Sequence, residues 1–182
     1  QRALLAQGQL TADSIATLTG ADAFSPYVLE LAPRRYFVFD SVEAIADWIA
    51  CLLDATGVRE AALVGHSLGA LVALEAAARF PTRISRIALL GPAVPMAVSE
   101  ALLDAARADD HVAFELIAGW SHSAGKQLGG NPVPGMWMMG NALRLMERSR
   151  PGALHVDLRA CNDYANGIAA AAAIRCPALL MV

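Results

Sequence analysis

Apolar residues recur at helical spacing between residues 40 and 57. In DSVEAIADWIACLLDATG, positions 42, 45, 49, 52 and 53 are apolar and would share one face of a helix. Asp40 and Glu43 have the spacing of an N-terminal capping box, and Gly57 is typical of the residue that follows a helix. The pattern therefore predicts an amphipathic helix that ends at Gly57.

The next segments alternate between short apolar runs and helical patterns. REAALVG, which ends at Gly65, predicts a strand, and LGALVALEAAARFP predicts a helix that Pro81 ends. RISRIALLGPA predicts a second strand. Both strands are apolar at successive positions, so we expect each to be buried on both faces. Such strands, separated by helices, are typical of a parallel sheet covered by helices.

Helical patterns dominate after residue 92. They are interrupted by a Gly/Pro-rich loop, SHSAGKQLGGNPVPG, and the chain ends in IRCPALLMV, which predicts another buried strand. The expected helices cover residues 99–108, 112–118, 136–148 and 153–166. We therefore predict an α/β fold in which residues 1–92 and 168–182 form a mostly parallel sheet flanked by helices, and residues 93–167 are an inserted helical lid.

The first 39 residues carry weaker signals. Residues 2–9 are compatible with a short helix, and RRYFVFD is compatible with a strand. The start of the chain lacks the charged and apolar regions of a secretory signal. The longest apolar run, residues 168–174, is too short to span a membrane, so no membrane partner is expected.

Composition narrows the possible environment and partners. The chain has 182 residues, 56% of them hydrophobic and 17% charged, which indicates a globular domain with a sizeable core. A net charge of −3 without a basic cluster argues against a nucleic-acid partner. Three cysteines without C-x-x-C spacing favour a reducing compartment, and we expect the cytoplasm. No His/Cys group has metal-site spacing, so neither a metal nor a cofactor is predicted.

A serine between two glycines carries the chemistry of this chain. Gly65, Ser67 and Gly69 form G-x-S-x-G between a predicted strand and a predicted helix. That context is typical of a nucleophile elbow, in which Ser67 attacks a carbonyl and the N–H of Leu68 forms half of an oxyanion hole. The alternative is a serine that only caps an ordinary helix, but capping does not explain the paired glycines. The neighbouring His66 is expected to be structural, because adjacent side chains diverge in a tight turn.

These segments resemble the α/β-hydrolase superfamily, more closely its cap-bearing single-domain bacterial members. The resemblance covers about Ser41 to Val182 and rests on the elbow, its flanking elements, the helical block and the returning strand. It implies a triad in the chain order Ser, Asp or Glu, His, with the acid after the returning strand. This sequence ends at Val182 within that strand, and residues 1–40 lack the family's H-G and D-x-P-G-x-G-x-S motifs. We therefore expect an incomplete copy with no catalytic acid or base.

The other polar candidates fall in the predicted lid. They are His111, His122, His155, Asp157 and Asp163, which we expect mainly to be solvated or to take part in lid packing.

The lid would form the walls of an apolar pocket above Ser67. Trp120, His122 and Trp137 are the candidate substrate contacts.

The leading hypothesis is a serine hydrolase that forms and hydrolyses an acyl-enzyme from a small, apolar, ester-like substrate. An acyltransferase with the same nucleophile is the nearest variant. The alternative from another class is a non-catalytic, degenerate hydrolase fold or a gene fragment. A haloalkane dehalogenase is disfavoured because that chemistry needs an aspartate where this chain has Ser67.

Overall fold

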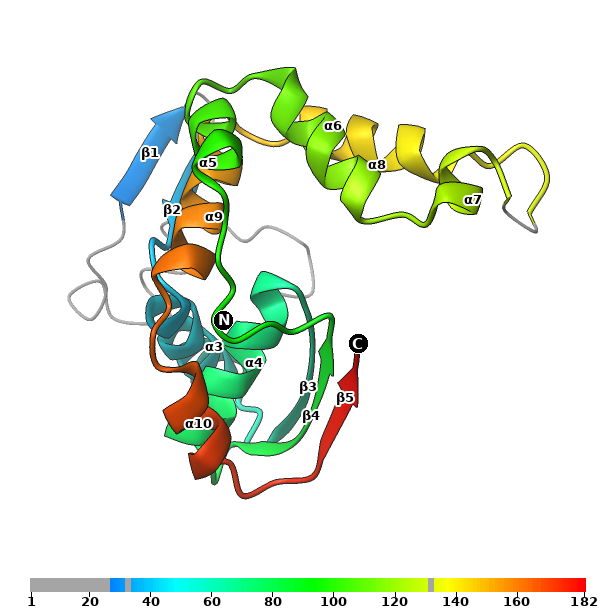
Figure 1. Cartoon of the computed structure of the whole chain (residues 1–182). Helices are drawn as coiled ribbons and strands as arrows, with labels where there is room; N and C mark the ends of the chain where they lie inside the picture. Colours follow the sequence, from blue (N-terminus) through cyan, green and yellow to red (C-terminus); the bar gives the residue numbers. More distant parts are fainter. Residues whose placement is uncertain (1–26, 32–33, 131–132) are drawn as a thin grey trace. The chain divides into compact units, whose positions relative to one another are not determined.

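The chain forms two compact units. The computed structural model describes residues 27–31, 34–130 and 133–182, and Figure 1 shows their helices and strands. Residues 1–97 and 160–182 form the first unit, called here the core unit, and residues 98–159 form the second, called the helical unit. The helix predicted for residues 2–9 lies outside the described residues.

The core unit contains a parallel sheet in the strand order β3-β4-β5. The strands are β3 (Ala61–His66), β4 (Ile84–Leu90) and β5 (Ala178–Met181). Three helices supply the side chains that pack with the sheet, and they are α3 (Val42–Thr56), α4 (Leu68–Arg79) and α10 (Gly167–Ala173). The predicted α/β fold, a small parallel sheet flanked by helices, is confirmed.

Burial on both faces of the strands was a wrong prediction. Exposure alternates along β3, where Val64 is 76% exposed, and every residue of β5 is exposed. In β4 the side chains of Ile84, Ile87 and Leu89 are buried in the core cluster, whereas those between them are more exposed. Within the described residues, α3, α4 and α10 therefore bury one face of the sheet. An apolar sequence allows a strand to be buried on both faces. Whether both faces are buried depends on which other segments pack against them.

The two ends of α3 follow capping rules, with one correction to the prediction. Ser41, not Asp40, is the N-cap: its backbone is extended and its Oγ accepts a hydrogen bond from Ala44 N at 3.3 Å. Gly57 ends the helix as expected, in a left-handed conformation with φ 69°, and its N–H donates to Asp54 O. The helix begins at Val42, one residue later than the predicted capping box implied. The residue just before it is therefore Ser41, whose hydroxyl reaches the N–H of Ala44, the third residue of the helix.

An antiparallel hairpin precedes α3. It pairs β1 (Tyr27–Leu31) with β2 (Arg34–Val38), in the register that places Tyr27 opposite Val38. The strand expected in RRYFVFD corresponds to β2, whereas β1 was not predicted. After the hairpin, the ring of Phe39 lies 5.8 Å from that of Trp48 on α3, measured between centroids.

The helical unit consists of short helices, as the sequence predicted. They are α5 (Glu100–Arg107), α6 (His111–Trp120), α7 (Ala124–Gln127), α8 (Met138–Glu147) and most of α9 (Ala153–Asp163). Its small core joins Leu102 and Ala106 of α5 to Ala113 of α6, with Leu154 and Leu158 of α9 packed against them. Only α7, within the Gly/Pro-rich loop, was not predicted. No helix in the described part of the chain has the length and apolar character needed to cross a membrane.

A buried carboxylate lies on the helix that follows Ser67. Glu75 of α4 is 2% exposed, and its Oε2 accepts hydrogen bonds from Tyr164 Oη at 2.6 Å and from Asn166 Nδ2 at 2.9 Å. Burial, together with the Glu75 carboxylate, raises the pKa of Tyr164 well above its usual value, so this phenol stays a donor at neutral pH. The contact fastens the segment between α9 and α10 to α4.

Candidate functional site

Ser67 occupies a sharp turn between β3 and α4. Its backbone has φ 53° and ψ −119°, a positive-φ conformation that residues other than glycine rarely adopt. The Ser67 N–H donates to Leu90 O at the end of β4 at 3.0 Å, which holds the turn against the neighbouring strand. The side chain is exposed and makes no capping hydrogen bond to α4. These features disfavour a simple helix cap and match the strand-turn-helix geometry of a nucleophile elbow.

The turn is possible because Gly65 has no side chain. A Cβ at this position would lie 1.9 Å from Gly69 O and 2.7 Å from Ala70 N, so the first turn of α4 passes directly over it. Gly69 is different. Apart from its chain neighbours and the backbone of its own helix, no described heavy atom lies within 4 Å of the position that a Cβ would take there. Of the two glycines that flank Ser67, Gly65 is therefore the one at which contacts with described residues leave no room for a side chain.

The backbone N–H of Leu68 is available beside Ser67. Leu68 is the first residue of α4, so its N–H has no acceptor within the helix, and it donates to no backbone carbonyl of the described residues. The N-terminus of a helix also carries a partial positive charge that favours an anion. This N–H can therefore donate to negative charge that develops next to the Ser67 hydroxyl.

His66 points toward the loop after β4. Atoms Cδ2 and Nε2 of its ring lie 3.8 Å from the position of a Cβ on Gly91, and the ring makes no hydrogen bond to Ser67 in the structure. His66 is also the only histidine in the sequence of the core unit. The core unit therefore provides no imidazole hydrogen-bonded to the Ser67 hydroxyl.

The three predicted pocket residues all belong to the helical unit. Trp120 is 67% exposed and Trp137 is 57% exposed. The ring of Trp137 lies over Gly140, so close that a Cβ on Gly140 would be 2.2 Å from a ring carbon. The ring of His122 is half-buried, and its Nδ1 is 2.8 Å from Ala118 O. Their use as substrate contacts stays a prediction.

The remaining polar candidates of the sequence are dispersed within α6 and α9. His111 on α6 lies between two carboxylates, and Asp157 and Asp163 on α9 are exposed. His155 Nε2 is buried and has no hydrogen-bond partner among the residues that the structure describes. In the described part of the chain, no three His, Cys, Asp or Glu side chains are arranged to hold a metal ion.

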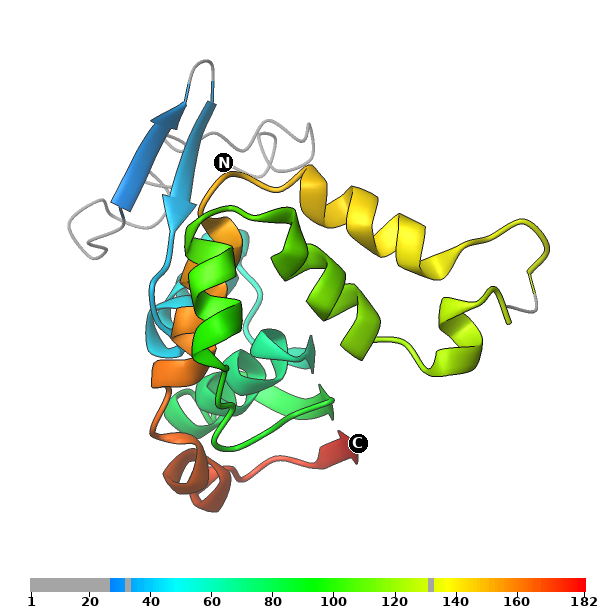
Figure 2. The same ribbon diagram turned by 45° about the horizontal axis from the view of Figure 1, so that its top comes forward.

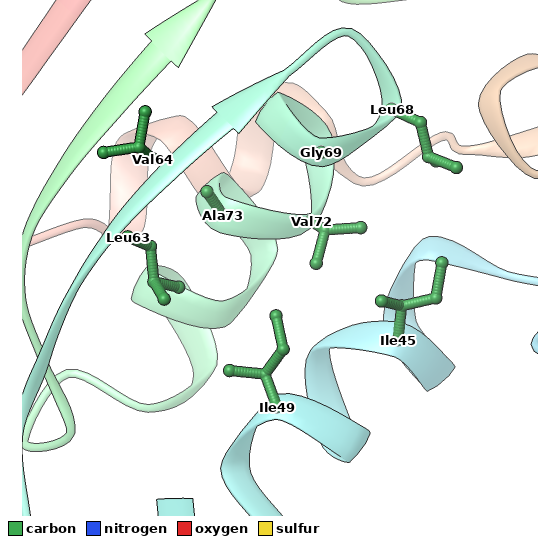
Figure 3. A pocket seen from close by; sticks show the side chains of 8 residues that line it. All are labelled: Ile45, Ile49, Leu63, Val64, Leu68, Gly69, Val72 and Ala73. Atoms are coloured by element: carbon green, nitrogen blue, oxygen red, sulfur yellow. The ribbon is translucent and has the colours of Figure 1, made fainter. Parts of the chain in front are cut away.

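An apolar cavity of about 290 Å³ adjoins the elbow on the α3 side of β3. Figure 3 shows the side chains that line it, which come from α3 (Ile45, Ile49), β3 (Leu63, Val64) and α4 (Leu68, Gly69, Val72, Ala73). Leu63 and Val64 are consecutive and point to opposite faces of the strand, so the cavity wraps around the edge of β3. Among the described strands, β3 pairs only with β4, and the cavity is therefore the opening at its unpaired edge.

This combination of a parallel strand, a strained serine turn and a helix that begins at the residue after the serine is typical of the α/β-hydrolase class of fold. The family described as alpha/beta hydrolase fold matches residues 19–125, more than half of the chain. The chain belongs to this family.

Solved structures show the same fold. Est816, described as an N-acyl homoserine lactone degrading enzyme, is similar with 22% identity and a TM-score of 0.57 over 77% of this chain. The hydrolase olei00960 from Oleispira antarctica is similar with 18% identity and a TM-score of 0.56 over 78% of this chain. The chain covers 55% and 53% of these two proteins, about half of their length.

The strain at Ser67 leads to a stability prediction. We expect Ser67→Gly to raise the free energy of unfolding by about 1 kcal/mol or more, because glycine adopts φ 53° without a Cβ penalty. Ser67→Ala keeps the Cβ and should leave the stability within about 0.5 kcal/mol of the parent chain. Urea unfolding of the three proteins measures the difference. Equal stability of the glycine and alanine variants would contradict a strained turn.

Proposed function

We propose that this protein is a serine hydrolase in which Ser67 attacks the acyl carbonyl of a small, apolar, ester-like substrate. The observation that carries the proposal is the conformation of Ser67, with φ 53° and an exposed hydroxyl that makes no capping bond. Strain of this kind persists where the surrounding structure enforces it, and it is common at catalytic residues. Membership of the α/β-hydrolase family supports the same conclusion.

The proposed reaction uses two neighbouring groups of the turn, the Ser67 hydroxyl and the Leu68 N–H. Ser67 Oγ forms a bond to the carbonyl carbon, and the carbonyl oxygen becomes negatively charged. This oxyanion accepts a hydrogen bond from the Leu68 N–H. A base takes the hydroxyl proton and returns it to the leaving group, after which water hydrolyses the acyl-enzyme.

Within the described part of the core unit, no histidine contacts the hydroxyl of the proposed nucleophile. His66 faces Gly91 rather than the Ser67 hydroxyl. Members of a catalytic triad act as a unit, and loss of one member lowers turnover by several orders of magnitude. We therefore propose that the 182-residue chain alone reacts slowly at Ser67 and is nearly inactive as an esterase.

A fluorophosphonate probe at millimolar concentration tests this proposal. We expect covalent labelling of Ser67 about 10⁴-fold slower than that of a hydrolase with a complete triad, but selective for Ser67. Added imidazole should accelerate the labelling, because it supplies a base in solution. Intact-mass spectrometry gives the rate, and peptide mapping identifies the modified serine.

Two variants serve as controls for the labelling. Ser67→Ala should abolish it, whereas Ser123→Ala should leave it unchanged, because Ser123 is an exposed serine at a helix start that likewise makes no capping bond. Equal labelling of Ser123 and Ser67, or none at Ser67 with imidazole present, would refute the nucleophile. Rapid labelling without imidazole would instead refute the absence of a base.

A further inference from the structure

His111 connects two helices of the helical unit through both nitrogens of its ring. Nδ1 is 3.2 Å from Glu115 Oε1, one turn further along α6, and Nε2 is 3.0 Å from Glu147 Oε1 at the end of α8. Figures 1 and 2 show α6 and α8 side by side, with the start of α6 near the end of α8. The ring therefore lies between one carboxylate on its own helix and one on the neighbouring helix.

This geometry requires a protonated ring if both contacts are to be hydrogen bonds. A carboxylate only accepts, and a neutral imidazole has a single N–H, so it can donate to Glu115 or to Glu147 but not to both. The charged imidazolium donates through both nitrogens and also attracts both carboxylates. Loss of one proton therefore removes one hydrogen bond and the charge attraction together.

The other charged groups nearby have partners of their own. Arg144 on α8 contacts the second oxygen of Glu147 at 2.9 Å and keeps that carboxylate charged. On α5, Arg107 pairs with Asp104 at 2.8 Å.

Two further aspartates lie in the turn before α6. Asp110 accepts the N–H of Val112, and Asp109 accepts that of Gly152. Glu115 and Glu147 are thus the described charged groups that hydrogen-bond to the His111 ring. The edge or face of that ring also meets the ring of Phe114, at 5.8 Å between centroids.

The end of α8 lies at the surface of the helical unit. None of its residues is buried, although it packs against α6 and α7. A separate hydrogen bond, from Gly152 N to Asp109 Oδ1 at 2.7 Å, joins the turn before α9 to the turn before α6. That bond does not involve the His111 ring. Loss of the His111 contact would therefore loosen α8 while the start of α9 stays attached.

We propose that His111 is a pH-dependent clasp that fastens the end of α8 to the start of α6, and that α8 loosens when the ring loses its proton. The clasp lies wholly within residues 98–159 and does not depend on the proposed hydrolase activity.

The direction of the pH dependence follows from the carboxylates. The hydrogen bond that His111 donates to Glu147, and to a lesser degree its interaction with Glu115, raises the pKa of His111 above its ordinary value of 6.5. His111 lowers the pKa of Glu147 in turn, with a further contribution from Arg144. A histidine whose pKa is raised by folding stabilises the folded arrangement below its ordinary pKa, and this contribution is lost as the pH rises through the raised value. The clasp is therefore closed below the ordinary pKa of histidine and weakens as the pH rises through the raised value.

Hydrogen exchange of the 182-residue chain tests the clasp. After correction for intrinsic exchange rates, the protection of the α8 amides should fall about threefold between pH 6 and pH 8, a size suited to an exposed ion pair. The midpoint should coincide with the His111 titration followed by NMR, and protection at the start of α9 should stay constant.

Two glutamate variants test whether the pH dependence comes from the contact between His111 and Glu147 rather than from ion pairs in general. Glu147→Ala should give low α8 protection at every pH, because the partner on α8 is lost. Glu115→Ala should keep the transition and shift its midpoint to lower pH, because one of the two carboxylates remains. The clasp is refuted if α8 protection in the parent chain is independent of pH. It is also refuted if the transition survives in Glu147→Ala, or if α8 and α9 lose protection together.

Discussion

Gly65→Ala is expected to lower the free energy of unfolding of the core unit by about 3 kcal/mol or more, or to prevent folding. The new methyl group would lie 1.9 Å from Gly69 O, and that oxygen belongs to the backbone of α4, so no side-chain rotation relieves the overlap. Either α4 moves away from β3 or the Ser67 turn opens. Urea unfolding followed by circular dichroism measures the loss.

Gly69→Ala is the matched control for this prediction. The same methyl group there has no described atom within 4 Å outside its own helical turn and chain neighbours, and alanine is favoured over glycine in a helix by up to about 1 kcal/mol. We expect stability equal to that of the parent chain or slightly higher. Similar losses in the two variants would show that the close approach at Gly65 is not what the turn requires.

Glu75→Ala is the second substitution with a large expected effect. It removes the acceptor of Tyr164 Oη and Asn166 Nδ2, and Tyr164 is only 4% exposed. A buried donor without its acceptor, together with the space left by the side chain, should lower the free energy of unfolding by about 3 kcal/mol. Denaturant unfolding measures this loss, and amide exchange between α9 and α10 should increase because that segment loses its attachment to α4.

Glu60→Ala removes the same side chain at an exposed position just before β3. Its stability should stay within about 0.5 kcal/mol of the parent chain. If Glu75→Ala were as mild as this control, the buried carboxylate would not fasten the segment between α9 and α10.

Much of the fold could be predicted because its signals are local. The apolar spacing of α3, the terminating Gly57 and the helix that ends before Pro81 are each encoded within a few residues. The same holds for the turn at Ser67, because the glycine before it, the strand and the helix are adjacent in the sequence. The first helix was misplaced only at its cap, where two polar residues, Asp40 and Ser41, compete for one role.

Longer-range features could not be predicted with equal success. Glu75 is the lone acid in an apolar helix, which signals a special environment, but its partners Tyr164 and Asn166 are about ninety residues away. The contact of His111 with Glu147 likewise spans 36 positions. For the same reason, apolar strands were expected to be buried on both faces, although Val64 and every residue of β5 are exposed.

The sequence by itself determined the order of the helices and strands from α3 to β4 and the position of the nucleophile candidate, because each depends on neighbours along the chain. Tertiary structure alone decided which face of the sheet is covered, which donors meet Glu75 and which carboxylates flank His111. Burial and hydrogen bonding depend on distance in space, and the spacing of residues in a sequence does not contain that distance.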